Sequence, residues 1–169
     1  NAKVNIKGTS NIYQPKKKYK FDMPQGYRIG APYFSHPVDE FSLNNSLLSP
    51  FVLNEELAWR AARSAGMASP QTQLVDVELN SNSSPQATLG MYLLTEGYDK
   101  SWRERNGYEQ GAFYKESTEK KTRLNEDDSD IQDWIYNLEN LTGEDLRKYI
   151  LDNVDVHSAI NHDATMAIM

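Results

Sequence analysis

The chain has 169 residues, no cysteine, and 24 acidic side chains against 18 Lys and Arg, which gives a formal net charge of −6. The absence of Cys excludes a disulfide scaffold, a thiol nucleophile and a thiolate metal site. No stretch approaches the ~20 apolar residues that a membrane-spanning helix needs. The 10 Tyr, 5 Phe and 3 Trp argue against disorder. The length fits one ordinary domain or a part of a larger one.

Charge is distributed unevenly along the chain. Residues 1–20 hold six Lys and no acid, whereas residues 116–155 hold twelve acids and five bases. An acidic protein is a poor general binder of nucleic acid, so no nucleic-acid partner is expected. The basic start can still serve a local anion such as phosphate.

Alternating polar and apolar residues predict two strands near the start, at 3–7 and 16–21, which form a hairpin around a loop at 8–15. In the second strand, Lys16, Lys18 and Lys20 are expected on one face. Residues 22–50 are rich in Pro, Gly, Ser and Asn and are interpreted as a long irregular connection.

A helix is predicted at 54–65, because Asn54 is a good N-cap and Gly66 is placed to end it. The next predicted elements are strands at 74–79 and 88–95 around a polar loop at 80–86, a short helix at 99–105 and a short strand at 111–115. Helical spacing then predicts helices at 131–138, from 142 to 150, and from Asp155 onward. Strands with one helix therefore come first and helices follow, which is an α+β layout.

Five short segments stand out along the chain, at residues 6–10, 15–21, 57–67, 92–100 and 111–115. In their order and spacing they resemble the CotH family of spore-coat-protein kinases. The family shows a K-G-N/T-S turn, a K-K-x-Y-K strand, a helix of the form N-K-L-A-x-D-L ending in G-M, a strand ending in L-L-T-E-x-x-D-K, and then G-x-L-Y-K. The resemblance covers residues 3–160, and Lys18 stands where the family usually has Ser.

The resemblance implies an atypical protein-kinase-like fold that uses ATP and Mg²⁺ to phosphorylate Ser or Thr of a protein. It implies an antiparallel sheet lobe at 1–98, with the nucleotide-binding part, and the start of a helical lobe at 99–169. The family's metal-binding aspartates follow the helix that reaches Met169, so they are expected outside this chain. No catalytic residue and no metal ligand is therefore assigned within it.

Phosphoryl transfer depends on positioning and on charge neutralisation, which suggests roles for particular residues. The resemblance implies that the nucleotide is contacted by a turn, two strand lysines and a linker: Gly8, Thr9, Ser10, Lys17, Lys20, Thr95 and Glu96. Glu55 or Glu56, on the helix, is the candidate partner for a lysine.

The same residues have simpler structural interpretations. A Lys-rich strand is often an exposed sheet face, and carboxylates in the first turn of a helix interact with its dipole. Glu96 and Asp99 could be capping residues. The run of acids at 126–130 is interpreted as a solvated loop, because it lacks the ligand spacing of a calcium loop.

The sequence thus favours a CotH-type kinase domain, secreted or at a cell or spore surface, with a protein as its substrate. The alternative is a non-catalytic surface, adhesion or structural module with a degenerate kinase-like fold.

Overall fold

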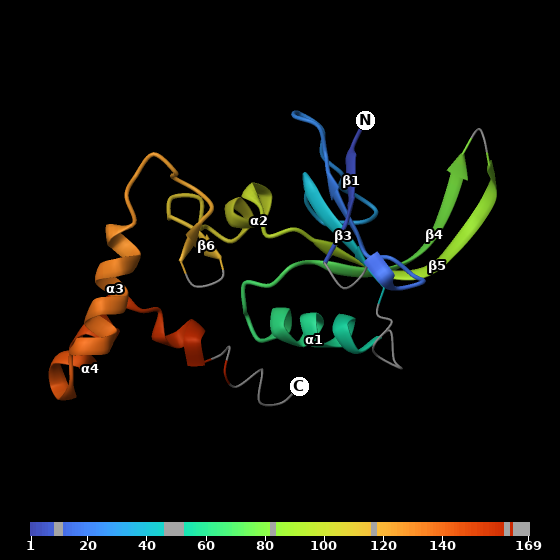
Figure 1. The fold of residues 1–169 in the computed structure, drawn as a ribbon. Helices are drawn as coiled ribbons and strands as arrows, with labels where there is room; N and C mark the ends of the chain where they lie inside the picture. Colours follow the sequence, from blue (N-terminus) through green and yellow to red (C-terminus); the bar gives the residue numbers. More distant parts are fainter. Residues whose placement is uncertain (9–11, 46–52, 82–83, 116–117, 161–162, 164–169) are drawn as a thin grey trace. The chain divides into compact units, whose positions relative to one another are not determined.

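The computed structural model describes residues 1–169 except 9–11, 46–52, 82–83, 116–117, 161–162 and 164–169. The chain forms two compact units, Asn1–Gly107 and Tyr108–Ile168. It is α+β, as predicted, because a five-stranded antiparallel sheet is combined with several helices (Figure 1). None of the helices in the described part of the chain has the length and apolar character that a membrane span requires.

The sheet of the first unit has the strand order β1-β2-β3-β5-β4, and every neighbouring pair is antiparallel. The strands are β1 (Lys3–Ile6), β2 (Tyr19–Asp22), β3 (Glu40–Asn44), β4 (Thr72–Ser81) and β5 (Ser84–Glu96). The hairpin predicted at the start of the chain is confirmed as β1 and β2, although β2 begins only at Tyr19.

The prediction of an irregular connection over 22–50 is wrong in its second half, where a strand forms. Residues 40–44 form β3, which is the central strand of the sheet and pairs with both β2 and β5. Three of its five side chains, those of Glu40, Ser42 and Asn44, are polar. A short strand with little apolar sequence gives a weak local signal.

The hairpin predicted over 74–95 is confirmed as β4 and β5, but its predicted loop at 80–86 is too long. β4 continues to Ser81 and β5 begins at Ser84. Strand pairing therefore continues through polar residues such as Ser81 that composition alone assigns to a loop.

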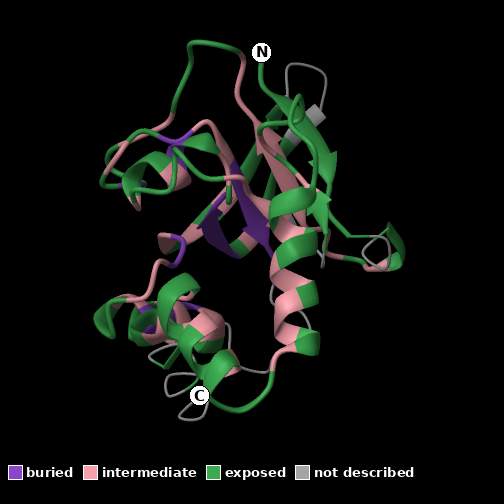
Figure 2. Ribbon diagram, turned by 90° about the vertical axis from the view of Figure 1, so that its left-hand side faces the viewer, coloured by how far each residue is buried: buried purple, intermediate pink, exposed green. Residues whose placement is uncertain are grey.

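One face of the sheet is apolar. Phe41 and Leu43 of β3 point to it, together with Tyr92 and Leu94 of β5, and the connection before β3 covers it with Phe34 and Val38. The rings of Phe21 and Phe41 stack with centroids 4.8 Å apart. The main core therefore lies on this face of the central strands. Figure 2 shows buried residues, in purple, within the sheet.

Helix α1 (Leu53–Ser64) follows β3 and packs along β4. It begins one residue before Asn54, so the predicted cap lies within the helix. Its end is as predicted: Gly66 has a φ of +80°, and the N–H of Met67 donates to the carbonyl of Ala62 over 3.0 Å. Ala62 is buried.

Helix α2 (Lys100–Arg105) follows β5 and confirms the short helix predicted at 99–105. Asp99 is its N-cap, because a carboxylate oxygen of Asp99 accepts from the N–H of Trp102 over 3.0 Å. Trp102 is buried.

The second unit contains a two-stranded ribbon, β6 (Tyr114–Lys115) and β7 (Glu119–Lys120), then α3 (Ser129–Asn140) and α4 (Gly143–Asn153). The predicted strand 111–115 is reduced to its last two residues, and β7 was not expected. The helices predicted from about 130 are confirmed. A further helical turn begins after Asp155, whose carboxylate accepts from the N–H of Ser158 over 3.0 Å.

Candidate functional site

The face of the sheet opposite the apolar one carries most of the sheet's polar residues beside the buried Leu93, and we call it the polar face. One rung of directly paired residues crosses all five strands and is formed by Asn5, Lys20, Ser42, Thr95 and Thr72. Side chains alternate between the two faces along each strand, so Glu40 and Asn44 belong to the same face as Ser42. The sheet therefore gathers polar groups from segments distant in sequence.

The α1 helix contributes Glu55 to the polar face. The amide nitrogen of Asn44 donates to a Glu55 carboxylate oxygen over 2.9 Å and to the hydroxyl of Thr95 over 3.2 Å. Glu56 has a different environment: it is buried and bonded to Arg60 over 3.0 Å. Among the described residues, neither Glu55 nor Glu56 forms an ion pair with a lysine.

Lys20 lies on the polar face and is engaged by two carboxylates. Its Nζ is 2.7 Å from Glu40 Oε2 and 3.2 Å from Asp22 Oδ1. Burial lowers the pKa of Lys20, but the hydrogen bonds to Glu40 and Asp22 outweigh that effect, so the pKa is raised. The charge of Lys20 is already balanced.

Lys17 does not reach the polar face. Its ammonium group donates to the backbone carbonyls of Ile12, over 2.6 Å, and Gln14, over 2.5 Å. Lys16 also departs from the expected pattern, because its Nζ lies 4.3 Å from the centroid of the Tyr92 ring, on the apolar face. The prediction that Lys16 shares a face with Lys20 is therefore wrong, since the regular strand begins only at Tyr19.

Lys7 was not singled out by the sequence, yet its side chain reaches over the polar face. Its Nζ lies 3.1 Å from Ser42 Oγ. The residue as a whole is exposed, but its ammonium end is crowded: burial lowers the pKa of Lys7, and Lys18 lowers it further. Glu40 and Glu55 oppose the shift. Lys7 belongs to the motif at 6–10, and that motif was the feature of the sequence that could have pointed to it.

The turn predicted to contact a nucleotide begins directly after Lys7. Gly8 has a φ of +83°, a left-handed conformation that favours glycine. Thr9 and Ser10, which were predicted to share that role, lie outside the described residues.

Thr95 and Glu96 end β5 but face opposite sides of the sheet. Thr95 is buried on the polar face, whereas the Glu96 carboxylate has no exposed surface at all. Glu96 accepts from Arg105 over 2.7 Å and from the N–H of Gln71 over 2.9 Å, and lies 2.7 Å from His36 Nε2. The carboxylate is thus fully occupied by the protein.

The linker after β5 passes very close to β3. The N–H of Gly97 donates to the Glu40 carbonyl over 2.9 Å, and a Cβ on Gly97 would lie 2.8 Å from Glu40 Oε1. Only glycine permits this approach without a shift of the Glu40 side chain. The Glu40 carboxylate is therefore positioned by both Lys20 and Gly97.

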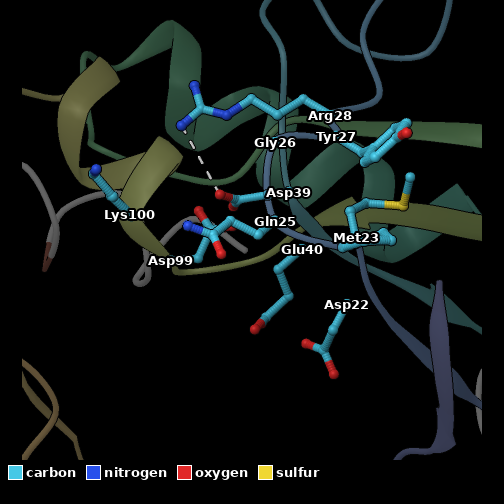
Figure 3. A pocket seen from close by; sticks show the side chains of 11 residues that line it. Asp22, Met23, Gln25, Gly26, Tyr27, Arg28, Asp39, Glu40, Asp99 and Lys100 are labelled. Atoms are coloured by element: carbon cyan, nitrogen blue, oxygen red, sulfur yellow. Dashed lines mark ion pairs between the residues drawn. The ribbon is translucent and has the colours of Figure 1, made fainter. Parts of the chain in front are cut away.

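A cavity of about 500 Å³ opens beside this linker (Figure 3). It is lined by Asp22, Met23, Pro24, Gln25, Gly26, Tyr27, Arg28, Asp39, Glu40, Asp99 and Lys100. A hydrogen bond between Asp39 and Asp99, together with burial, raises the pKa of Asp39 to about 6, while Arg28 opposes the shift. The cavity is adjacent to the polar face through Asp22 and Glu40.

A family model described as CotH kinase protein matches residues 4–169. The chain belongs to the CotH kinase family. Among curated proteins, none matches it. The family predicted from the short motifs is thus confirmed, and membership indicates a kinase-like function.

Kinases in general use ATP together with a divalent metal ion. Within the described residues of this CotH chain, no group of three or more His, Cys, Asp or Glu is placed to hold a metal ion. The acids at 126–130 illustrate this, because Asp127 and Asp130 bond locally to Ser129 and Tyr114. These residues therefore do not fit a Mg²⁺ site, and no step is assigned to the metal.

Proposed function

We propose that the chain binds ATP and belongs to a CotH-type kinase domain that phosphorylates Ser or Thr of an exported or surface protein. The observation that carries this proposal is the polar, lysine-bearing face of the sheet next to a glycine turn, in a chain whose family is that of the CotH kinases. Phosphoryl transfer needs cations and backbone groups around the phosphates more than it needs covalent chemistry. The nucleotide contacts predicted for Gly8, Thr9, Ser10 and Thr95 remain part of the proposal.

The arrangement of elements supports a kinase-like interpretation. A hairpin that holds the turn is followed by a third strand, a single helix, two more strands and a linker. In protein kinases a glycine-rich turn covers the phosphates, and a lysine on the third strand pairs with a glutamate of the following helix. Here Glu55 of α1 contacts Asn44 of β3, which supports the comparison of α1 with that helix.

One feature departs from that arrangement and supports the alternative of a non-catalytic module. β3 (Glu40–Asn44) contains no lysine, and the residue that contacts Glu55 is Asn44. The cations of the polar face come instead from the first two strands and their ends. An active kinase with this sheet must neutralise phosphate with the lysines of the first two strands. A degenerate fold would keep the sheet but would not bind phosphate there.

The direct test measures transfer of radiolabelled γ-phosphate from ATP to a mixture of surface proteins by the full-length protein that contains this chain. We expect labelled phosphoserine or phosphothreonine with Mg²⁺ and none with EDTA. ATP binding without any transfer would favour the non-catalytic module. No detectable ATP binding with or without Mg²⁺ would contradict the proposed function.

A further inference from the structure

Two lysines face each other where the β1–β2 hairpin ends. The last registered pair is Ile6 with Tyr19, and the ladder continues by one residue, because the N–H of Lys7 donates to the Lys18 carbonyl over 2.9 Å. Lys7 and Lys18 are thus directly opposite. Like charges in this position destabilise an antiparallel pair.

The lysines differ in whether the protein balances their charge. Lys20 is bound by Glu40 and Asp22. Among the described residues, no carboxylate lies within ion-pair distance of Lys7 or Lys18, and the hydrogen bond of Lys7 goes to the neutral hydroxyl of Ser42. Two neighbouring ammonium groups without a carboxylate are suited to an anion with several negative oxygens.

The surroundings of the pair also fit a phosphate chain. Gly8 follows Lys7 at once in a left-handed conformation, so the hairpin turn starts directly after one of the two lysines. Burial and the charge of Lys18 both lower the pKa of Lys7, and an anion between the two lysines would relieve the repulsion. Lys3, the first residue of β1, belongs to the same face as Lys7, is exposed and pairs in register with Asp22.

We propose that Lys7 and Lys18, rather than Lys17 and Lys20, hold the phosphate groups of the nucleotide. This inference rests on the proposed function and identifies its phosphate-binding residues. Lys20 then acts as a positioning residue that holds Glu40 against Gly97, and Lys17 fixes the carbonyls of its own loop.

The test measures dissociation constants of ATP, of inorganic tripolyphosphate and of adenosine for the full-length protein and its variants, by titration calorimetry at low salt. Lys7→Ala and Lys18→Ala should each weaken ATP and tripolyphosphate about tenfold or more, as expected for loss of a charge-assisted contact to phosphate. Any adenosine affinity should be unchanged, because the lost contacts are to phosphate alone. The matched control, Lys3→Ala, should change each constant less than twofold.

Folding is monitored in the same samples by the melting temperature, and Lys7→Gln serves as a second variant that keeps a polar contact to Ser42. Lys7→Gln should melt at or above the melting temperature of the parent, because it removes the repulsion from Lys18, and should still lose phosphate affinity. If Lys7 and Lys18 variants bind ATP within twofold of the parent, or if Lys17→Ala or Lys20→Ala weakens it more, the inference is wrong while the proposed function stands. A parent that binds tripolyphosphate through both lysines but does not bind ATP contradicts the proposed function alone. A parent that binds neither contradicts both.

Discussion

Glu96 is an acid without exposed surface that contacts a guanidinium, an imidazole and a backbone N–H. A carboxylate loses its hydration on burial, and such partners must replace it. Arg105 comes from α2, His36 from the connection before β3, and Gln71 from the segment before β4. Glu96 therefore joins three segments that lie far apart in the sequence.

Glu96→Gln should lower the free energy of unfolding by about 3 kcal/mol, because it leaves the Arg105 charge without its partner. Urea denaturation of the full-length protein measures this change. Glu104→Gln is the matched control on the neighbouring helix: its carboxylate is exposed and lies 3.6 Å or more from Lys100 and Arg28, so its cost should stay below about 1 kcal/mol. Equal costs for the two variants would show that the Glu96 network does not stabilise the fold.

Asp39 is a second acidic residue whose environment changes its behaviour, in this case its pKa. Its pKa is raised to about 6 by the hydrogen bond with Asp99 and by burial. The folded state therefore holds a proton there that the unfolded chain releases near pH 4. This contribution to stability is complete below pH 4 and is lost as the pH rises through about 6.

Asp39→Asn should remove that pH dependence. Because about a third of the side chain is exposed, the effect is discounted to about 1 kcal/mol or less. We expect the variant to lose less stability than the parent between pH 5 and pH 7.5 in urea denaturation. Asp76→Asn, an exposed carboxylate on β4, should follow the parent curve. If the free energy of unfolding of Asp39→Asn and that of the parent changed equally with pH across this range, the raised pKa of Asp39 would be excluded.

At the scale of elements, the local sequence pattern was sufficient to predict a helix or strand where the neighbouring residues themselves mark its ends. Asp99 begins α2 and Gly66 ends α1 because capping depends on neighbouring residues. β3 was missed because its polar residues are explained only by the partners that the sheet supplies. Asn44, for example, has Glu55 and Thr95 as partners, and Thr95 is 51 residues away.

The candidate site shows the same division. The motif at 6–10 and the lysine strand were recognised from sequence, but which lysine reaches the polar face was not. Lys17 and Lys20 match the family pattern, yet Lys17 binds its own loop and Lys20 is balanced by carboxylates. Lys7 reaches Ser42, 35 residues further along the chain. No local pattern encodes such a contact.

At the scale of the whole molecule, burial is concentrated in one unit. All the buried hydrophobic residues of the described chain lie before Gly107, and they are Phe34, Val38, Phe41, Leu43, Ala62, Tyr92, Leu93, Leu94 and Trp102. The described residues of the second unit, from Tyr108, include none that is buried. The two units should therefore differ in their ability to fold alone.

A fragment of residues 1–107 should show a cooperative thermal transition by circular dichroism, since it contains the sheet and its core. A fragment of residues 108–169 should unfold gradually, because helix propensity without burial gives marginal stability. A cooperative transition in the second fragment, or none in the first, would contradict the assignment of the stabilising core to the first unit.

The sequence by itself determined the α+β class, most helices and strands, and membership of the CotH family, because periodicity, caps and short motifs are properties of neighbouring residues. The tertiary structure decided the central strand β3, the enclosure of Glu96 and the pairing of Lys7 with Lys18 across the hairpin. Charge balance decides which lysine is available to an anion. That balance depends on carboxylates brought near by strand pairing, which the order of residues does not reveal.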